Sequence, residues 1–264
     1  MDYKTICESV IEIATETGQF IRERINTFSS DKIESKGLHN FVTEIDKAAE
    51  RKIVDKLRKL VKNAGFIAEE GTASESGDLY NWVIDPLDGT TNFIHGTPPV
   101  AVSIALTETN NPVIGVIYEI WLDEVFYAWI DGQAYLNGKE IHVSDTEKVK
   151  DSLIATGFPY NNFDRMDGFM KSMEYFFTHS HGMRRLGSAA TDLAYVACGR
   201  YDGFYEYNLN PWDVAAGALI VKQAGGRVTD FEGGDQYLFG REIVAANELL
   251  HQPFLSDVAR FMKK

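Results

Sequence analysis

The sequence predicts a layered α+β protein in which helices cover the faces of sheets. Apolar residues recur with helical spacing near both ends of the chain, whereas the middle has the short apolar runs of strands. From residue 152 onward, strand and helix patterns alternate. Because no repeat or low-complexity linker interrupts the chain, we expect a single domain over 1–264, with an α+β half at about 1–150 and an α/β half at about 151–264.

Two amphipathic helices are expected before the first strand. In the first 26 residues, one helical face carries Ile6, Val10, Ile13, Ala14, Phe20 and Ile21. Gly37 and Asn40 interrupt this pattern. A second apolar face then contains Ile45, Ala48, Ala49, Ile53, Leu57, Leu60 and Val61. Both helices should therefore pack one side against another layer.

The middle of the chain predicts a largely antiparallel sheet. Phe66–Ala68 is a short apolar strand, and the small polar residues 71–80 indicate a surface loop. Strand patterns then recur from Asn81 to about Val143, in the runs WVID, VAVSIALTE, PVIGVIYEI and EVFYAWI. Asn137-Gly138 is a strong hairpin signal between two further short runs.

In the second half, strands and helices alternate. Strands are expected at LIATGF, MRRLG, DGFYEY, GRVTD and IVAAN. Helices are expected up to about residue 179, from Ser188, from Pro211 and from Glu248. Proline favours the first turn of a helix, which supports the start at Pro211. Helices and sheets should therefore form layers in this half as well.

Composition and charge exclude several classes of protein. The chain has 39 acidic and 26 basic residues, a net charge of −13, and no long basic run. Nucleic acids and anionic membranes require a basic face, so neither is an expected partner. The N-terminus lacks the pattern of a signal peptide, and no stretch of about 18 apolar residues occurs, so a cytoplasmic protein is expected. Cys7 and Cys198 share no metal-binding spacing and should be reduced, buried thiols.

One segment carries the strongest chemical signal. The apolar run Trp82–Ile84 ends in Asp85, and Asp88 follows three residues later. Their carboxylates can converge at the strand end, where they and the carbonyl of Leu87 would suit a hard cation such as Mg²⁺. Gly89–Thr91 then opens a predicted helix, whose N–H groups and hydroxyls can hold a phosphate. Taken alone, the two acids could equally be turn and capping residues.

Two further acidic features strengthen the metal-site interpretation, although each has an ordinary alternative. Glu69-Glu70 ends the preceding strand, where a glutamate pair is usually solvated surface. Asp213 lies in the first turn of a predicted helix, where an acid commonly stabilises the helix dipole. Together with the two aspartates above, these residues could bring at least four carboxylates to one site.

Two features elsewhere in the chain fit the same site. Gly187-Ser188-Ala189 opens a helix directly after Arg184 and Arg185. Arg184 could face solvent, the substrate or a partner subunit. Asp46 lies at the start of the second helix, where it could cap the helix or support a metal ligand. Neither feature decides the function by itself.

Five segments in this order resemble the inositol monophosphatase family, nearly from one end of the chain to the other. They are VTEID, EEG, DPLDGTTNF, RRLGSAATDLAYVA and WDVAAGALIVKQAGG. DPLDGTTNF resembles the first signature of the family, and WDVAAGALIVKQAGG resembles the second. The resemblance implies a layered αβαβα sandwich of the sugar-phosphatase type, shared by inositol monophosphatase and fructose-1,6-bisphosphatase. It also implies a Mg²⁺-dependent, lithium-inhibited phosphatase that forms a homodimer.

The resemblance implies a set of metal ligands. Glu69, Asp85 and the Leu87 carbonyl would bind one Mg²⁺, and Asp85, Asp88 and Asp213 would bind a second. A third, weaker and mostly hydrated ion would touch Glu69, giving two to three ions per subunit. Every expected ligand position holds an oxygen donor in this sequence.

The same resemblance implies roles toward the substrate. Residues 87–90 would hold the phosphate, and Glu206 would meet hydroxyls of the alcohol. Asp46, Glu69 and Thr90 would act on the attacking water. The complete expected substrate surface comprises Leu87, Asp88, Gly89, Thr90, Arg184, Gly187, Ser188, Ala189 and Glu206.

Inositol 1-phosphate is the expected substrate, hydrolysed by a metal-activated water without a covalent intermediate. Fructose-1,6-bisphosphate, the 2′-phosphate of NADP and 3′-phosphoadenosine nucleotides stay open as alternatives. The loop at 71–80 is shorter than in animal members of the family, which would leave the site more open. An alternative of another class is a non-catalytic regulatory binding protein on the same fold, but the intact metal set favours catalysis. No EF-hand spacing supports a calcium-binding protein.

Overall fold

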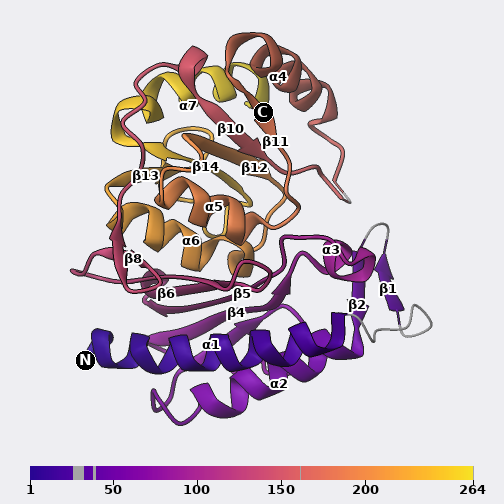
Figure 1. Cartoon of the computed structure of the whole chain (residues 1–264), viewed down its shortest axis with the longest axis vertical. Helices are drawn as coiled ribbons and strands as arrows, with labels where there is room; N and C mark the ends of the chain where they lie inside the picture. Colours follow the sequence, from indigo (N-terminus) through magenta and orange to yellow (C-terminus); the bar gives the residue numbers. More distant parts are fainter. Residues whose placement is uncertain (26–32, 38–39, 161, 264) are drawn as a thin grey trace.

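Five alternating layers of helices and sheets form the protein (Figure 1). The computed structural model describes residues 1–25, 33–37, 40–160 and 162–263. Three layers consist of helix pairs: α1 (Tyr3–Ile25) with α2 (Glu44–Leu57), α5 (Ala189–Ala197) with α6 (Pro211–Gln223), and α4 (Met166–His179) with α7 (Glu248–Met262). A seven-stranded sheet separates the first two pairs, and a five-stranded sheet separates the last two. The expected αβαβα sandwich is therefore confirmed.

The first helix layer follows the predicted pattern closely. α1 buries Val10, Ile13 and Ile21, which belong to its predicted apolar face. α2 ends at Leu57, so the last part of the second expected helix lies in the turn that follows. Between these helices, β1 (Ile33–Gly37) and β2 (Asn40–Thr43) form a two-stranded antiparallel sheet, which the hydrophobic pattern did not predict.

The seven-stranded sheet has its strands in sequence order. They are β3 (Gly65–Ala68), β4 (Tyr80–Asp88), β5 (Ala101–Glu108), β6 (Asn111–Glu119), β7 (Glu124–Trp129), β8 (Ala134–Leu136) and β9 (Lys139–Ile141). Only β3 and β4 run parallel, and the remaining pairs are antiparallel, as the sequence predicts. Asn137 and Gly138 both have positive φ in the β8–β9 hairpin, which is the conformation that this turn signal favours.

The five-stranded sheet has the order β11-β10-β12-β14-β13. Its strands are β10 (Leu153–Thr156), β11 (Gly182–Arg184), β12 (Gly203–Tyr207), β13 (Gly226–Thr229) and β14 (Glu242–Asn247). β10 runs parallel to β11 and β12, whereas β14 is antiparallel to both of its neighbours. No helix in the described part of the chain combines the length and apolar character that a membrane crossing requires.

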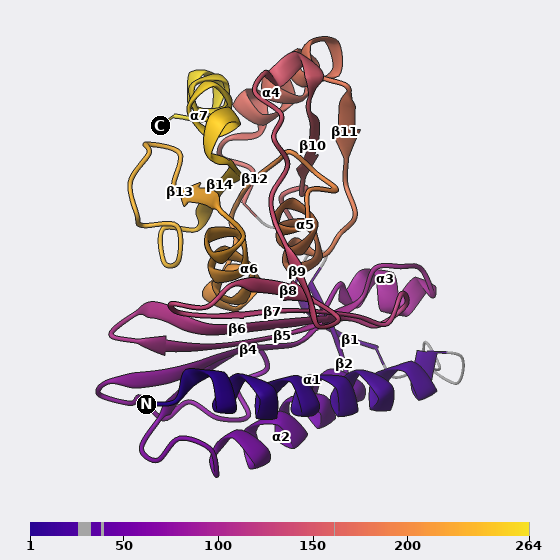
Figure 2. The same cartoon turned by 60° about the vertical axis from the view of Figure 1, so that its left-hand side comes forward.

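The central helix layer, α5 and α6, lies between the two sheets and packs against both (Figure 2). α5 and α6 contain many alanines, and small side chains allow helices to approach their neighbours closely. At Gly115 of β6, a Cβ would lie 2.6 Å from the Ala216 carbonyl oxygen of α6, so only glycine fits there. This close packing sets the N-terminal ends of α5 and α6 against the C-terminal end of β4.

Candidate active site

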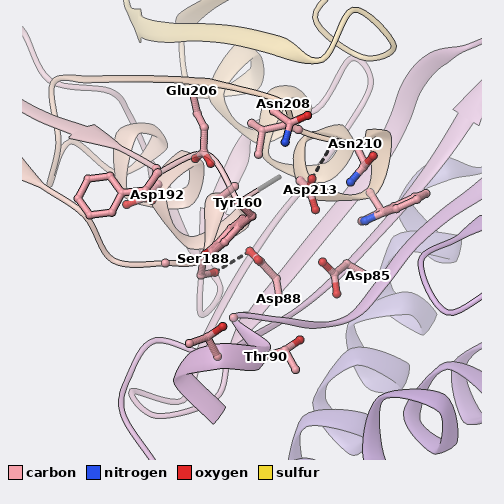
Figure 3. Close-up of a pocket in the computed structure, with 18 of the residues that line it drawn as sticks. Asp85, Asp88, Thr90, Tyr160, Ser188, Asp192, Glu206, Asn208, Asn210 and Asp213 are labelled. Carbon is pink, nitrogen blue, oxygen red and sulfur yellow. Dashed lines mark hydrogen bonds between the residues drawn. The ribbon is translucent and has the colours of Figure 1, made fainter. Parts of the chain in front are cut away.

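A pocket lies where the end of β4 meets the N-terminal ends of α5 and α6 (Figure 3). Its volume is about 150 Å³, and both halves of the chain contribute to its walls. Most residues singled out from the sequence line it, namely Glu69, Asp85, Leu87, Asp88, Gly89, Thr90, Gly187, Ser188, Ala189, Glu206 and Asp213. Two expected residues, Asp46 and Arg184, do not form part of its lining.

A β-bulge places both aspartates of β4 on the same side of the sheet. Asp85 pairs with Ser103 and Asp88 with Ala101, so β4 advances three residues while β5 advances two. In a regular strand, residues three apart face opposite sides, and one extra residue restores the common side. The strand therefore continues past Asp85, where the sequence pattern ended it, and still directs both carboxylates toward the α5–α6 layer.

Asp85 is a deeply buried acid of the pocket. It is 2% exposed, and its Oδ1 accepts a hydrogen bond from the Leu87 N–H at 2.9 Å. Burial raises the pKa of Asp85 well above its ordinary value, and the nearby charge of Glu69 raises it further. A cation beside such a carboxylate would stabilise its ionised form, because the positive charge offsets both the burial and the repulsion from Glu69.

Asp88 connects the first half of the chain to the second. Its Oδ2 accepts hydrogen bonds from the Ser188 hydroxyl at 2.6 Å and from the Ala190 N–H at 2.8 Å. Burial raises the pKa of Asp88 to about 6, while the bond from Ser188 opposes this rise. Ser188 is also the N-cap of α5, because its hydroxyl accepts from the Thr191 N–H. The start of α5 is thereby held at the acid of β4.

Glu69 and Asp213 complete a group that we call the acid cluster, comprising Glu69, Asp85, Asp88 and Asp213. Burial and the charge of Asp213 raise the pKa of Glu69 to about 8, although a hydrogen bond to Asp85 lowers it. Burial and the charge of Asp88 raise the pKa of Asp213 to about 7. Figure 3 shows Asp85, Asp88 and Asp213 pointing toward a common space.

Asp46 supports the pocket from behind. It is buried in the first turn of α2 and accepts a hydrogen bond from the Thr90 hydroxyl at 3.2 Å. The Leu87 carbonyl lies at the same distance of 3.2 Å from this hydroxyl. Thr90 is the first residue of α3 (Thr90–His95), which begins directly after Gly89. α2 thus contacts the turn between β4 and α3.

The far end of the pocket contains a second pair of buried acids. Glu206 of β12 is 7% exposed and Asp192 of α5 is 1% exposed. Burial raises the pKa of each well above its ordinary value, and the nearby Arg185 lowers both. Arg185 donates to the Tyr160 hydroxyl at 2.6 Å and also lies over the Tyr160 ring. Carboxylates at this end can accept hydrogen bonds from the hydroxyls of a polar ligand.

The two adjacent arginines, Arg184 and Arg185, lie on different sides of the chain, and it is not the expected one that faces the pocket. Arg184 is the last residue of the edge strand β11, where it is exposed and donates to the Met183 carbonyl at 2.9 Å. Arg185, the next residue, lines the pocket instead. Neighbouring side chains of an extended segment point to opposite sides, so only one of the two can face the cavity. Arg184 therefore does not line this pocket, and its expected role toward the substrate stays a prediction.

Sequence reasoning missed three residues of the far end. Asp192 of α5 lies four residues after the N-cap Ser188. On a helix this spacing brings two residues to the same face, and it could have identified Asp192 from the sequence. Arg185 could have been found by strand alternation, once the bounds of β11 were known. Tyr160 stands in an irregular segment after β10, where the sequence gives no periodic signal.

The donor set fits a hard divalent cation. All four members of the acid cluster offer carboxylate oxygens, and their raised pKa values reflect repulsion and burial that a bound cation would relieve. Across the described residues, no three acidic, histidine or cysteine side chains are arranged so that they could hold a metal ion as they stand. Several oxygens accept protein hydrogen bonds instead. Mg²⁺ tolerates such an open site, because it keeps several waters and uses few protein ligands.

Comparisons with known proteins extend over nearly the whole chain. A model described as the inositol monophosphatase family matches residues 2–263. An inositol-1-monophosphatase of Mesorhizobium japonicum is 38% identical over 252 residues, covering 95% of each protein. The Nus factor SuhB of Pseudomonas aeruginosa is 40% identical over 253 residues, covering 94% of this chain and 93% of that protein. A solved IMPase structure from Thermotoga maritima has a TM-score of 0.88 at 36% identity, covering 96% of both chains.

Proposed function

This chain belongs to the inositol monophosphatase family, and we propose that it hydrolyses inositol 1-phosphate in a Mg²⁺-dependent reaction. The observation that carries this proposal is the acid cluster at the end of β4, which faces the hydroxyl and amide groups of the α3 and α5 starts. Carboxylates that would repel a phosphate ester by themselves become a binding site when they hold cations.

The acid cluster and the Leu87 carbonyl would hold the proposed Mg²⁺ ions. Bound Mg²⁺ would supply an activated water and neutralise the charge of the phosphoryl group. Gly89 and Thr90 line the same space and would contact the phosphate. Asp46 holds the Thr90 hydroxyl, so the orientation of this hydroxyl toward the attacking water depends on a buried residue.

The alcohol of the substrate would lie at the far end. The carboxylate of Glu206 lies against Gly157, where an added Cβ would be 2.0 Å from Oε1. Such a carboxylate, held against the backbone of a neighbouring strand end, can accept bonds from one or two adjacent hydroxyls. Gly187, Ser188 and Ala189 line the same pocket. These groups favour a polyol over an apolar alcohol.

Three finer properties belong to the same proposal, and the first two of them rest on family membership. They are inhibition by Li⁺, assembly as a homodimer and a cytoplasmic location. Li⁺ would compete for the position formed by Asp88 and Asp213, because the proposed second ion is the more exchangeable one.

A panel of phosphate monoesters tests the proposal. The wild-type protein should hydrolyse inositol 1-phosphate with Mg²⁺, lose turnover when a chelator is present, and recover it when Mg²⁺ is restored. Comparison of kcat/KM with fructose-1,6-bisphosphate, NADP and 3′-phosphoadenosine nucleotides ranks the alternatives. Full activity in the chelated protein would overturn the metal-dependent mechanism.

A substitution at the far end tests the alcohol assignment. Glu206→Gln keeps the shape of the side chain but replaces one acceptor oxygen by a donor, so kcat/KM for inositol 1-phosphate should fall by about tenfold or more. Hydrolysis of an aryl phosphate, which offers no hydroxyls, should change much less. An equal change for both substrates would contradict the placement of the alcohol at Glu206.

A regulatory role is the second candidate, because one relative that is 40% identical is named a Nus factor. The oxygen donors at all expected metal positions favour catalysis. The two proposals separate in the assay above, since a purely regulatory protein would show no turnover of any ester with excess Mg²⁺.

A further inference from the structure

We propose that Glu50, which no sequence motif singled out, positions the metal ligand Glu69. Glu50 lies on α2 and is 0% exposed. It does not line the pocket, so it cannot contact the substrate directly. This inference rests on the proposed function, because it assigns Glu50 a role in the Mg²⁺ site.

Both oxygens of Glu50 are occupied by backbone amides of one segment. Oε2 accepts from the Glu70 N–H and Oε1 accepts from the Thr72 N–H, each at 2.7 Å. Bonds from amides to a buried carboxylate are short and stronger than bonds between neutral groups. Glu50 therefore holds the turn that begins directly after Glu69.

Glu69 lies between this anchor and a second one. Its own N–H donates to the Ile84 carbonyl of β4 at 3.1 Å. The turn after it contains Gly71 with φ of +67°, and the Gly71 N–H donates to the Ala68 carbonyl at 3.3 Å. β4 thus fixes the chain on one side of Glu69, whereas Glu50 fixes it on the other. Without Glu50, two amides would lose a buried acceptor, and the turn would be free to shift.

The same helix face holds another part of the pocket. Asp46 and Glu50 are four residues apart on α2, a spacing that places both on one side of the helix. Asp46 contacts Thr90, and Glu50 contacts the segment after Glu69. One rigid helix therefore sets the positions of two pocket segments that are separated by a polar loop. A positioning residue of this kind should affect metal affinity more than the rate of the loaded enzyme.

The experiment compares Glu50→Gln with a matched control, Glu119→Gln. Glu119 is also a buried glutamate, 1% exposed, whose oxygens accept from the Trp121 and Leu122 N–H groups, but it does not line the pocket. Mg²⁺ binding is measured by calorimetry on the substrate-free protein, together with the Mg²⁺-induced rise in melting temperature. Both substitutions should lower the melting temperature without metal, because each replaces a buried, hydrogen-bonded carboxylate.

Only Glu50→Gln should weaken Mg²⁺ binding, by about 10-fold or more, as expected for loss of a group that orients a metal ligand. Its kcat at saturating Mg²⁺ should stay within a few-fold of wild type. Wild-type Mg²⁺ affinity in Glu50→Gln, or an equal loss in Glu119→Gln, would overturn the inference. If Glu50→Gln does not fold, Glu50→Asp keeps the charge but shortens its reach, and unchanged Mg²⁺ affinity in that variant overturns the inference too. A wild-type protein that binds no Mg²⁺ would instead refute the proposed function, and the inference with it.

Discussion

Individual acids of the pocket have structural bonds as well as proposed catalytic roles. Asp213 is the clearest case, because its Oδ2 accepts from the Asn210 N–H at 2.6 Å at the start of α6. The same residue is repelled by Asp88. The ordinary capping role and the proposed metal-ligand role would therefore coexist in one side chain, and the two roles differ greatly in energy. A cap contributes about 1 kcal/mol, whereas a metal ligand supports several kcal/mol of transition-state stabilisation.

The substitution Asp213→Asn separates these roles. Asparagine keeps an acceptor for the Asn210 N–H and removes the repulsion with Asp88, so the melting temperature without metal should stay near that of wild type. The Mg²⁺-induced stabilisation should largely disappear, and kcat/KM should fall on the order of 10³-fold. Thermal unfolding with and without Mg²⁺ and steady-state kinetics check this. Small, matching losses of stability and activity would show that Asp213 is only a cap.

Among the elements, β4 and the turn after it determine the geometry of the site. The bulge between Asp85 and Asp88 directs both acids inward, and the strand then turns at Gly89 into α3. Gly89 has φ of +97°, and an added Cβ would lie 2.8 Å from the Pro99 carbonyl oxygen. The turn thus requires glycine for two reasons, a left-handed backbone and the close approach of another segment.

Gly89→Ala should therefore destabilise the protein more than an equivalent change without a neighbour. Gly138→Ala is the control, since Gly138 has φ of +79° but nothing within 4 Å of an added Cβ. Each substitution should lower the free energy of unfolding by about 1–2 kcal/mol, because alanine disfavours the left-handed backbone. Only Gly89→Ala adds a clash with the backbone of another segment. Chemical denaturation should show the larger loss for Gly89→Ala, which should also lose turnover. Equal stability losses would mean that the segment at Pro99 moves freely.

At the scale of the whole molecule, the pocket exists only where the two halves of the chain meet. Besides the bonds to Asp88, the Asn92 side-chain amide donates to the Leu186 carbonyl at 2.9 Å. The Ser103 hydroxyl donates to the Trp212 carbonyl at 3.3 Å. These bonds join the ends of separate layers around the acid cluster. The single-domain assignment over 1–264 stays a prediction that unfolding experiments can examine.

The acid cluster makes the stability of the protein depend jointly on pH and metal. Folding raises the pKa of Asp88 to about 6, of Asp213 to about 7 and of Glu69 to about 8. For acids with raised values, the contribution to stability is complete below their unfolded pKa values and is lost as the pH rises through the folded ones. The metal-free protein should therefore lose stability between about pH 4 and pH 8.

Mg²⁺ should reverse this trend, because it binds the ionised carboxylates. The difference between the melting temperatures with excess Mg²⁺ and with chelator should grow over the same pH range, which cancels the effects of groups outside the site. In Asp213→Asn this growth should be smaller. A difference that is independent of pH would contradict the proposed cluster.

Sequence alone determined the order of the elements and the residue types of the acid cluster. Hydrophobic periodicity depends on which side of a helix or strand is buried, so it predicted α1 and the alternating second half. The Asn137-Gly138 turn signal predicted the hairpin. The order of the acid-containing motifs also predicted that Asp85 and Asp213 lie in one site, and both line the pocket. The short sheet of β1 and β2 was missed because neither strand has a long apolar run.

Only the tertiary structure decided how these residues meet. The bulge in β4, the inward position of Arg185 and the outward position of Arg184 depend on strand bounds and register, which local periodicity specifies poorly. The contribution of Asp192 and the anchoring by Glu50 depend on contacts between layers. A buried carboxylate on a helix has the same sequence signature as a solvated one, and only packing against the segment after Glu69 reveals its partners.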